Sequence, residues 1–178
     1  MASFTSKATG NWNSSGQTTW NEVGVPGSSD TVTIANAHII TISANATIGA
    51  TTVNGGLTTG TGVIVTLNGD LIIGNGTGND GTITYGAGST LALGSYNLLL
   101  NNCRVRSNAN SSSWAYITGS GAIATGGISY PIQDIQYSYV SHQNTGGITY
   151  AISVVNGGPN TSSLLMVPII RHLPTLTT

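Results

Sequence analysis

Charged side chains are the scarcest feature of this 178-residue chain. Four Lys and Arg and five Asp and Glu are present, and charged residues make up 5% of the sequence, against roughly 25% in an ordinary globular domain. The basic residues are scattered at Lys7, Arg104, Arg106 and Arg171, so no basic patch is available to neutralise phosphates. We therefore expect no direct nucleic-acid ligand.

Long apolar runs and paired cysteines are also missing. No run approaches the ~18 to 20 apolar residues of a membrane span, and the best candidate, residues 163–173, is interrupted by Pro168. The first twenty residues have neither the basic start nor the apolar stretch of a secretory signal. The single Cys103 excludes an internal disulfide. We expect no membrane contact, and a chain that stays in the compartment where it is made.

The residues that are abundant point to an ordered chain. Apolar residues make up 39% of the sequence, and 25 glycines stand among many Thr, Ser and Asn. Such a composition resembles a low-complexity linker, but the apolar residues occupy regular positions, which a disordered segment does not require. A chain of 178 residues is long enough for one domain with a real core.

A ten-residue spacing runs through the middle of the chain. Six apolar positions follow one another at this interval: Val53, Val63, Ile73, Ile83, Leu93 and Cys103. A second spacing, of twenty residues, relates Leu71 to Leu91 and Gly74 to Gly94. A fixed period of this length is typical of repeat architectures.

Each ten-residue unit holds a short alternating segment, such as VIVTL, DLIIG or TITYG, that ends at Gly or Asn turn residues. We therefore predict an all-β fold, a short parallel β-helix or β-solenoid with a capped N-terminus, in which two strands make a coil of about twenty residues and the six apolar residues form an inward ladder. An antiparallel β-sandwich remains the alternative, because regularly spaced strands also suit that fold.

The pattern divides the chain into three parts. Residues 1–30 are predicted to form an N-terminal cap and arm, in which Trp12, Trp20 and the turn at Pro26 cover the strand edges of the first coil. Residues 31–108 are predicted to form the solenoid coils, with His38 at a corner. Residues 109–178 are predicted to add further β-strands and a C-terminal docking or capping segment.

The tryptophans, the segments DTVTI and HIITI, and the run VNGGLTTGTGVIVTLNGDLIIG together resemble the entry coils of right-handed parallel β-helix proteins of phage particles and bacterial surface proteins. The resemblance covers residues 11–108 and implies a fold rather than an activity. Enzymes of this kind, such as polysaccharide lyases and tailspike glycosidases, carry clustered acids on one face of the solenoid. This chain departs from them there.

Catalytic groups are few. The acids are Glu22, Asp30, Asp70, Asp80 and Asp134. Only Asp70 and Asp80 are close in the repeat, and both lie beside Gly in predicted turns, where Asp is favoured for local backbone bonding. The segment NGTGND at residues 75–80 has too little charge for a strong calcium site, and Cys103 is expected to be a small buried hydrophobe. We predict no catalytic residue, no cofactor and no metal ligand, and so not an enzyme.

Tyrosine becomes frequent after residue 108, and the chain ends in an apolar run. Tyr is common at interfaces, although the alternation in DIQYSYV is equally typical of a half-buried strand. The tail at residues 164–170 either caps the last coil or docks on a partner, and the two tryptophans are either a lid or a ligand platform. The candidate interface residues are Trp12, Trp20, Tyr130, Tyr137, Tyr139, Leu164, Leu165, Met166, Ile169 and Ile170.

Three functions follow by elimination and resemblance. The favoured hypothesis is a non-enzymatic structural protein of a virus particle, a phage capsid decoration (cement) protein located in the virion after assembly in the host cytoplasm. Its partners would be the major capsid protein or other virion proteins, and a homo-oligomer, with a trimer favoured, is expected. The alternative is a glycan-binding or adhesive surface or fibre module. An ice-binding solenoid would need a regular threonine array, and we do not expect the threonines of TVTI, TTV and TITY to recur at one position.

Overall fold

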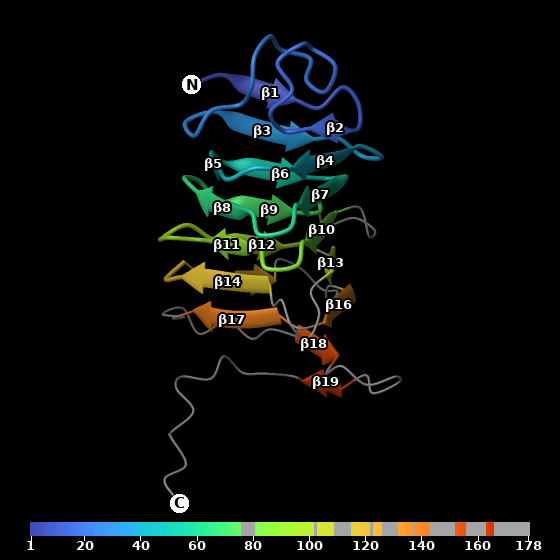
Figure 1. Ribbon diagram of the computed structural model, residues 1–178, viewed down its shortest axis with the longest axis vertical. Coiled ribbons are helices and arrows are strands. Elements are labelled where there is room, and N and C mark those ends of the chain that lie inside the picture. The colour runs from blue at the N-terminus through green and yellow to red at the C-terminus, as the bar shows by residue number, and fades with distance from the viewer. Residues whose placement is uncertain are drawn as a thin grey trace, which may run out of the picture.

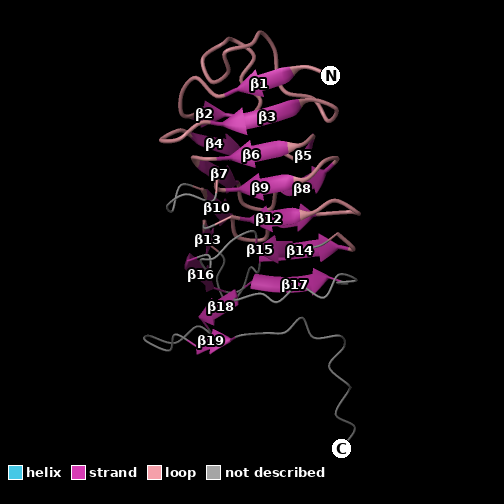
Figure 2. Cartoon of the chain, turned by 180° about the vertical axis from the view of Figure 1, so that it is seen from behind, coloured by secondary structure: helices cyan, strands magenta, loops and turns pink. Residues whose placement is uncertain are grey.

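The computed structural model describes residues 1–75, 81–101, 103, 106, 108 and 115–121, and the backbone alone of residues 104, 105 and 107 and of strands at residues 123–125, 132–136, 138–142, 152–155 and 163–165. The described chain is a column of short strands stacked along one axis, with the N-terminus at one end (Figures 1 and 2). Among these residues no helix has the length and apolar character needed to cross a bilayer.

The strands form three sheets that run along the column. Sheet 1 contains, in spatial order, β1 (Ser3–Thr5), β3 (Thr31–Ile34), β6 (Thr51–Val53), β9 (Leu71–Ile73), β12 (Leu98–Leu100) and β15 (Ile123–Thr125). Sheet 2 contains β2 (Gly10–Asn11), β4 (Ile39–Ile42), β7 (Gly56–Thr59), β10 (Thr82–Tyr85), β13 (Arg104–Ser107), β16 (Ile132–Gln136), β18 (Ile152–Val155) and β19 (Ser163–Leu165). Sheet 3 contains β5 (Ala46–Ile48), β8 (Ile64–Leu67), β11 (Thr90–Ala92), β14 (Ala115–Gly119) and β17 (Ser138–His142).

Strand pairing is parallel throughout the three described sheets, apart from the final pair, β18 with β19. From β1 to β18, successive strands of the chain belong to different sheets, so each of these strands pairs with strands one coil away. The predicted all-β parallel solenoid is confirmed, and the antiparallel sandwich is wrong. The parallel pairing also continues past residue 108, from β13 to β16 and from β14 to β17.

Each coil differs from the sequence-based expectation in the number of its strands. The sequence predicted two strands in a coil of constant length, whereas the structure has three strands in a coil of varying length. Thr51 pairs with Leu71, twenty residues later, but Leu71 pairs with Leu98, twenty-seven residues later. The difference in length falls between the strands and not within them. Repeat proteins accommodate insertions in loops in this way without disturbing the stack.

The six residues of the ten-residue spacing are all buried, with at most 5% of their surface exposed. They do not form one stack. Val53 and Ile73 are paired in sheet 1, whereas Ile83 lies in sheet 2 between Leu57 and Val105. Val63 directly precedes β8 and Leu93 directly follows β11 in sheet 3, and Cys103 directly precedes β13 in sheet 2. The spacing therefore detected inward positions on three different walls.

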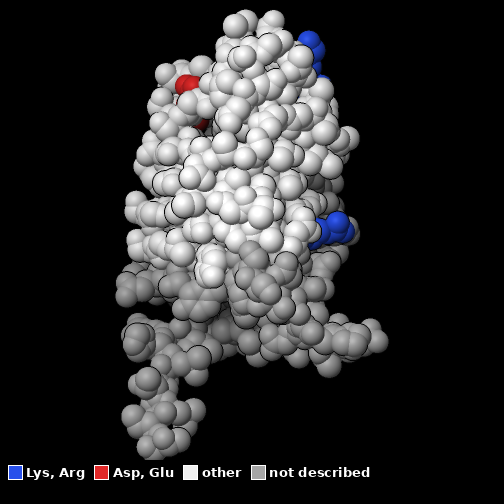
Figure 3. Space-filling model, in the orientation of Figure 1, with Lys and Arg blue, Asp and Glu red and all other residues white. Residues whose placement is uncertain are grey.

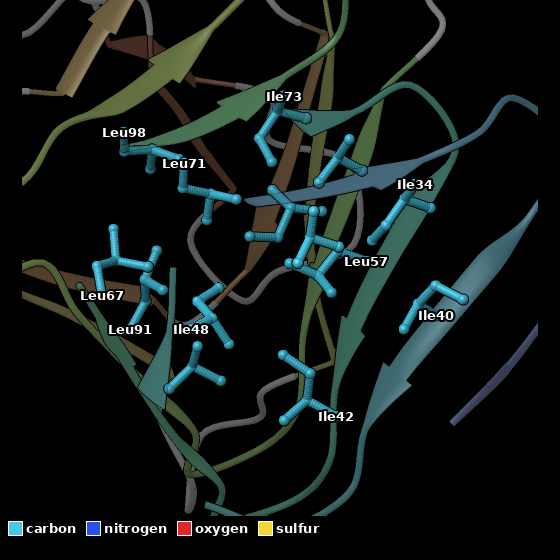
Figure 4. Close-up of a cluster of buried hydrophobic side chains, with 14 of the residues drawn as sticks. Ile34, Ile40, Ile42, Ile48, Leu57, Leu67, Leu71, Ile73, Leu91 and Leu98 are labelled. Carbon is cyan, nitrogen blue, oxygen red and sulfur yellow. The ribbon is translucent and has the colours of Figure 1, made fainter. Parts of the chain in front are cut away.

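The inward ladders are made of like side chains because alternate residues of each strand face the interior. Ile40, Leu57 and Ile83 are in register on neighbouring strands of sheet 2, and none is more than 1% exposed. Figure 4 shows that side chains from several strands meet in the same apolar interior. Burying one such side chain is worth about 1.5–3 kcal/mol, and the described core extends along the stack from Phe4 to Ile117.

The corners are also bonded from coil to coil. Gly74 N–H donates to Val53 C=O at 2.7 Å, and Asn101 N–H donates to Ile73 C=O at 2.7 Å. Gly74 has a φ of +83°, and a Cβ at this position would lie 2.2 Å from the carbonyl oxygen of Asn101. The backbone conformation and the neighbouring coil therefore both require glycine at this corner.

An aromatic cap covers the apolar interior at the N-terminal end. Trp12 and Trp20 are buried, and their rings meet edge to face with centroids 5.4 Å apart. Phe4 packs against Trp20 in the same manner, at 6.2 Å. The indole N–H of Trp20 donates to Trp12 C=O at 3.0 Å, so the buried polar group is paired, as burial requires. The predicted capped N-terminus is confirmed.

We predict that Ile83→Asp destabilises the protein by more than about 4 kcal/mol, because it places an unpaired charge in the interior. Thr82→Asp changes the neighbouring, partly exposed outward position and should lower the free energy of unfolding by about 1 kcal/mol or less. Urea unfolding of both variants measures the difference. Equal losses would contradict the assignment of inward and outward faces.

Candidate functional site

The acids whose side chains are described bind backbone or side-chain amides of neighbouring segments. Asp30 accepts hydrogen bonds from the N–H groups of Ala2 at 2.6 Å and Gly27 at 2.9 Å, and these two bonds lower the pKa of its carboxyl group. Glu22 accepts one from Thr5 N–H at 2.8 Å. Both carboxylates thus bind segments of the N-terminal arm and cap to one another.

Asp70 has a similar role between two coils. One of its oxygens accepts from the backbone N–H of Asn97 at 2.8 Å and from the side-chain amide of Asn97 at 3.1 Å. The sequence predicted local backbone bonding in a turn, whereas these bonds of the Asp70 carboxylate reach the next coil. Asp80 and the rest of the suggested calcium segment after Asn75 lie outside the described residues, so the turn role of Asp80 stays a prediction.

His38 is held at the corner between sheets 1 and 2. Its Nδ1 lies 2.9 Å from Ser6 Oγ, and Ser6 Oγ in turn accepts from Ala35 N–H at 2.8 Å. In the described part of the chain, no three His, Cys, Asp or Glu side chains gather closely enough to hold a metal ion. His142 is in β17, where the backbone alone is described, and His172 lies outside the described residues.

The thiol-bearing side chain of Cys103 is fully buried. Burial raises the pKa of its thiol to about 12, so the reactive thiolate is scarce at neutral pH. Tyr85 is buried beside it. Burial is the main cause that raises the pKa of the Tyr85 phenol, and the nearby Cys103 raises this pKa further. The pair belongs to the core, and its chemistry is not available to a substrate at the surface.

The structure describes five of the ten candidate interface residues. Trp12 and Trp20 are 1% and 0% exposed, so their rings are out of reach of a partner, and the lid interpretation agrees with this burial where the ligand-platform interpretation does not. Leu164 and Leu165 lie in β19, which pairs antiparallel with β18 at the end of sheet 2. This backbone pairing is what a capping tail would make. Five residues lie outside the described set: Tyr130, Tyr137, Met166, Ile169 and Ile170.

Tyr139 is in β17, in register with Tyr116 of β14. Tyr116 is 39% exposed, and it was not among the candidate interface residues. Its position could have been inferred from the alternation of AYITG, in which Ala115 and Ile117 face inward and are buried. Sheet 3 therefore brings two tyrosine positions together on adjacent coils.

Threonines stack on the outer faces, contrary to the sequence-based expectation. Thr5, Thr33 and Thr52 are in register in sheet 1. In sheet 2, Thr41 pairs with Thr58 and Thr58 pairs with Thr84. The columns were missed because the coils differ in length, so in-register residues have no constant spacing. Each column is short and lies on a different face: Ile72 follows Thr52, and Arg106 follows Thr84. The columns thus match the preference of exposed strand positions for β-branched residues.

The strands from β3 to β12 contain no charged residue. In the face that Figure 3 presents, the few coloured atoms lie near the margins and the area between them is uncharged. A shallow hollow of about 230 Å³ interrupts the surface of sheet 3 beside β5 and β8. It is lined by Asn45, Ala46, Thr47, Ile64 and Thr66. The described surface therefore offers hydrogen-bonding and apolar groups, and hardly any charge, to a partner.

We predict that Cys103 does not react with a thiol reagent such as DTNB in the folded protein at pH 8, because burial keeps the reagent away from the thiol and raises its pKa, so that little thiolate is present. In 6 M guanidinium chloride, one thiol per chain should react within minutes. Rapid reaction of the folded protein would contradict the inward position of Cys103.

The carboxylate of Asp30 should contribute stability that depends on pH. Its pKa is lowered in the folded state, so the contribution is complete above the unfolded pKa of about 3.9 and is lost as the pH falls through the folded pKa. Asp30→Asn should therefore melt at a lower temperature than the unmodified protein at pH 7, and the difference should shrink below about pH 4. A pH-independent difference in melting temperature would show that the charge is not involved.

The geometry above is that of a capped solenoid with structural acids and uncharged faces. No family model, no curated protein and no solved structure matches the chain. Its function is therefore argued from the chemistry of its own surfaces.

Proposed function

We propose that this chain is a non-enzymatic structural protein of a virus particle, and within that class a decoration protein that binds and stabilises a capsid shell. One observation carries the proposal. The chain forms a continuous parallel stack, and the strands from β3 to β12 contain no charged residue on their outward faces. A decoration protein must hold its shape and present a surface, and it has no reaction to perform.

The uses of the few charges support this proposal. Asp30, Glu22 and Asp70 each accept a hydrogen bond from a backbone N–H within the chain. A group that is already bound in this manner serves the fold. Binding to a shell would then depend on shape, hydrogen bonds and apolar contact, and would be only weakly sensitive to salt, because salt screens charge–charge interactions.

The cap supports the proposal from another direction. A solenoid presents bare strand edges at its ends, and such edges promote uncontrolled association. Phe4, Trp12 and Trp20 cover the apolar interior at the N-terminal end of this chain, where β1 and β2 begin sheets 1 and 2. A protein that must remain soluble until it reaches a particle, and then bind at defined positions, needs such control over its ends.

A glycan-binding or adhesive module is the second candidate. Tyr116, partly exposed on β14, is in register with Tyr139 on β17, and aromatic side chains at an uncharged surface are suited to stacking on sugar rings. Under this alternative Tyr116→Ala would abolish binding to a soluble glycan without changing the melting temperature, whereas a decoration protein would bind no free glycan.

Sedimentation with shells purified from the virus that encodes this chain tests the proposal. We expect binding that saturates at a fixed ratio to shell subunits, a higher melting temperature of the shell, and an affinity that changes by no more than about threefold between 0.1 M and 1 M NaCl. No co-sedimentation, or binding that disappears at high salt, would contradict it.

A truncation after Ser163 separates the two roles of the tail. It removes Leu164 and Leu165 of β19 and all that follows. If the tail docks on the shell, the shortened chain should remain folded, should lose its oligomeric state, which we expect to be trimeric, and should no longer sediment with shells. A shortened chain that is folded and still binds would show that the tail is a cap.

A further inference from the structure

The N-terminal edge of sheet 3 begins one coil later than the edges of its neighbours. Sheets 1 and 2 begin with β1 and β2, which pair with β3 and β4 of the next coil, whereas sheet 3 begins with β5, a strand of that next coil. Figure 1 shows β1 and β2 above the level of β5. The chain turns after Trp12, where Ser14 N–H donates to Asn11 C=O at 3.1 Å, and so forms no strand above β5.

The backbone of β5 therefore has one unpaired side. Asn68 N–H donates to Ile48 C=O at 2.7 Å, so Ile48 faces β8. Because consecutive strand residues direct their N–H and C=O groups to opposite sides, those of Thr47 point away from β8. In the part of the chain that the structure describes, no hydrogen bond reaches the backbone N–H or C=O of Thr47. Main-chain groups of this kind are the attachment points for an added strand.

The side chains around this edge leave it accessible. Thr47 is exposed, and Ala46, which faces inward, is only partly buried. Val65 and Leu91 occupy the same ladder on the next two coils and are fully buried. Ala46 of β5 is therefore smaller and more exposed to solvent than Val65 and Leu91, the next two residues of this ladder. The 230 Å³ hollow lies directly beside it, with Ile64 44% exposed in its lining.

We propose that the free edge of β5 binds a single extended segment of a partner polypeptide, which adds to sheet 3 as one further strand. The unpaired N–H and C=O groups of Thr47 match a peptide backbone and have no need of a charged ligand. The hollow beside Ile64 receives one uncharged side chain of that segment, because none of its five lining residues is charged.

The occupant is a single strand rather than a second solenoid. β1, β2 and the aromatic cap rise beside β5 on the same end of the column, so a second column approaching end to end would meet the cap before it reached β5. A peptide arm has the thickness of one strand and fits beside β1 without disturbing the cap. This inference is independent of whether the partner is a capsid protein.

Amide exchange in the free protein tests the open edge. We expect the Thr47 amide to exchange with solvent at the rate of an unprotected amide, whereas the amides of Ile48 and Thr66, which lie in the ladder between β5 and β8, exchange slowly. Protection of the Thr47 amide in the free protein would show that the edge is already paired, and would overturn the proposal.

Peptide binding tests the occupant. The probe is a fluorescein-labelled peptide of sequence GVIVTLN, identical to residues 62–68, which contain the strand that pairs with β5 on its other side. We expect saturable binding by fluorescence anisotropy and protection of the Thr47 amide in the complex. A control peptide with proline in place of the central valine should not bind. No saturable binding of GVIVTLN up to about 1 mM would overturn the proposal.

A matched pair of variants identifies the edge. Thr47→Pro removes the outward N–H, which is outside the ladder with β8, so the protein should fold normally and bind the peptide at least about tenfold more weakly. Thr47→Val keeps the N–H and should bind as the unmodified protein does. Ile64→Asp places a charge in the hollow and should weaken binding without changing the exchange of the Thr47 amide in the free protein.

Two results would overturn the proposal that the edge of β5 binds a peptide segment of a partner. Equal peptide affinity of Thr47→Pro and Thr47→Val would show that the backbone of β5 is not the attachment point. A concentration-dependent dimer that Thr47→Pro abolishes, seen by sedimentation velocity without peptide, would show that the occupant is a second copy of the chain.

Discussion

Register between parallel strands is the constraint on which the rest of this structure depends. Side chains alternate along a strand, so a slip of one residue would turn Ile40, Leu57 or Ile83 from the interior to solvent. Each coil therefore has to place its strands directly over those of the previous coil, whatever the length of its corners. The corner hydrogen bonds, such as that from Gly74 to Val53, fix this alignment where the chain changes direction.

The alternation of inward and outward residues within each strand could be predicted from the sequence. The pairing of residues between coils could not. Alternation within a strand is a local signal, which is why Val53, Ile73 and Ile83 were predicted to face inward and are buried. Stacking depends on the length of every corner in between. Thr58 and Thr84 are in register although they are twenty-six residues apart, and no constant spacing reveals such a pair.

The candidate site divides along the same line. Trp12 and Trp20 could be predicted as a cap because an exposed sheet edge needs a cover, and their burial agrees with that reasoning. The role of Asp70 in a turn followed from its neighbours in sequence, but its bond to Asn97 of the next coil did not. The open edge of β5 was missed because it depends on the coil at which each sheet begins, and the sequence contains no local mark of that difference.

The stacked coils also determine how far the stabilising effect of a bound partner extends. In a solenoid each coil contacts only its neighbours, so stability is a sum of local contributions. A partner bound near one end stabilises the coils that it touches directly and the remaining coils only through them. Because the strands from β3 to β12 contain no charged residue, like charges do not face one another on successive coils there. Such charges would repel, and the repulsion would increase with each coil added.

The aromatic cap has a consequence for spectroscopy. Two of the three tryptophans of the chain, Trp12 and Trp20, are in contact in the cap, while Trp114 lies outside the described residues. Their emission reports on the solvent exposure of the first coil and carries no information about coils far from it. Far-ultraviolet circular dichroism averages over every strand. Where the two signals yield the same transition midpoint, the column unfolds as a unit; where they differ, the ends of the column melt separately.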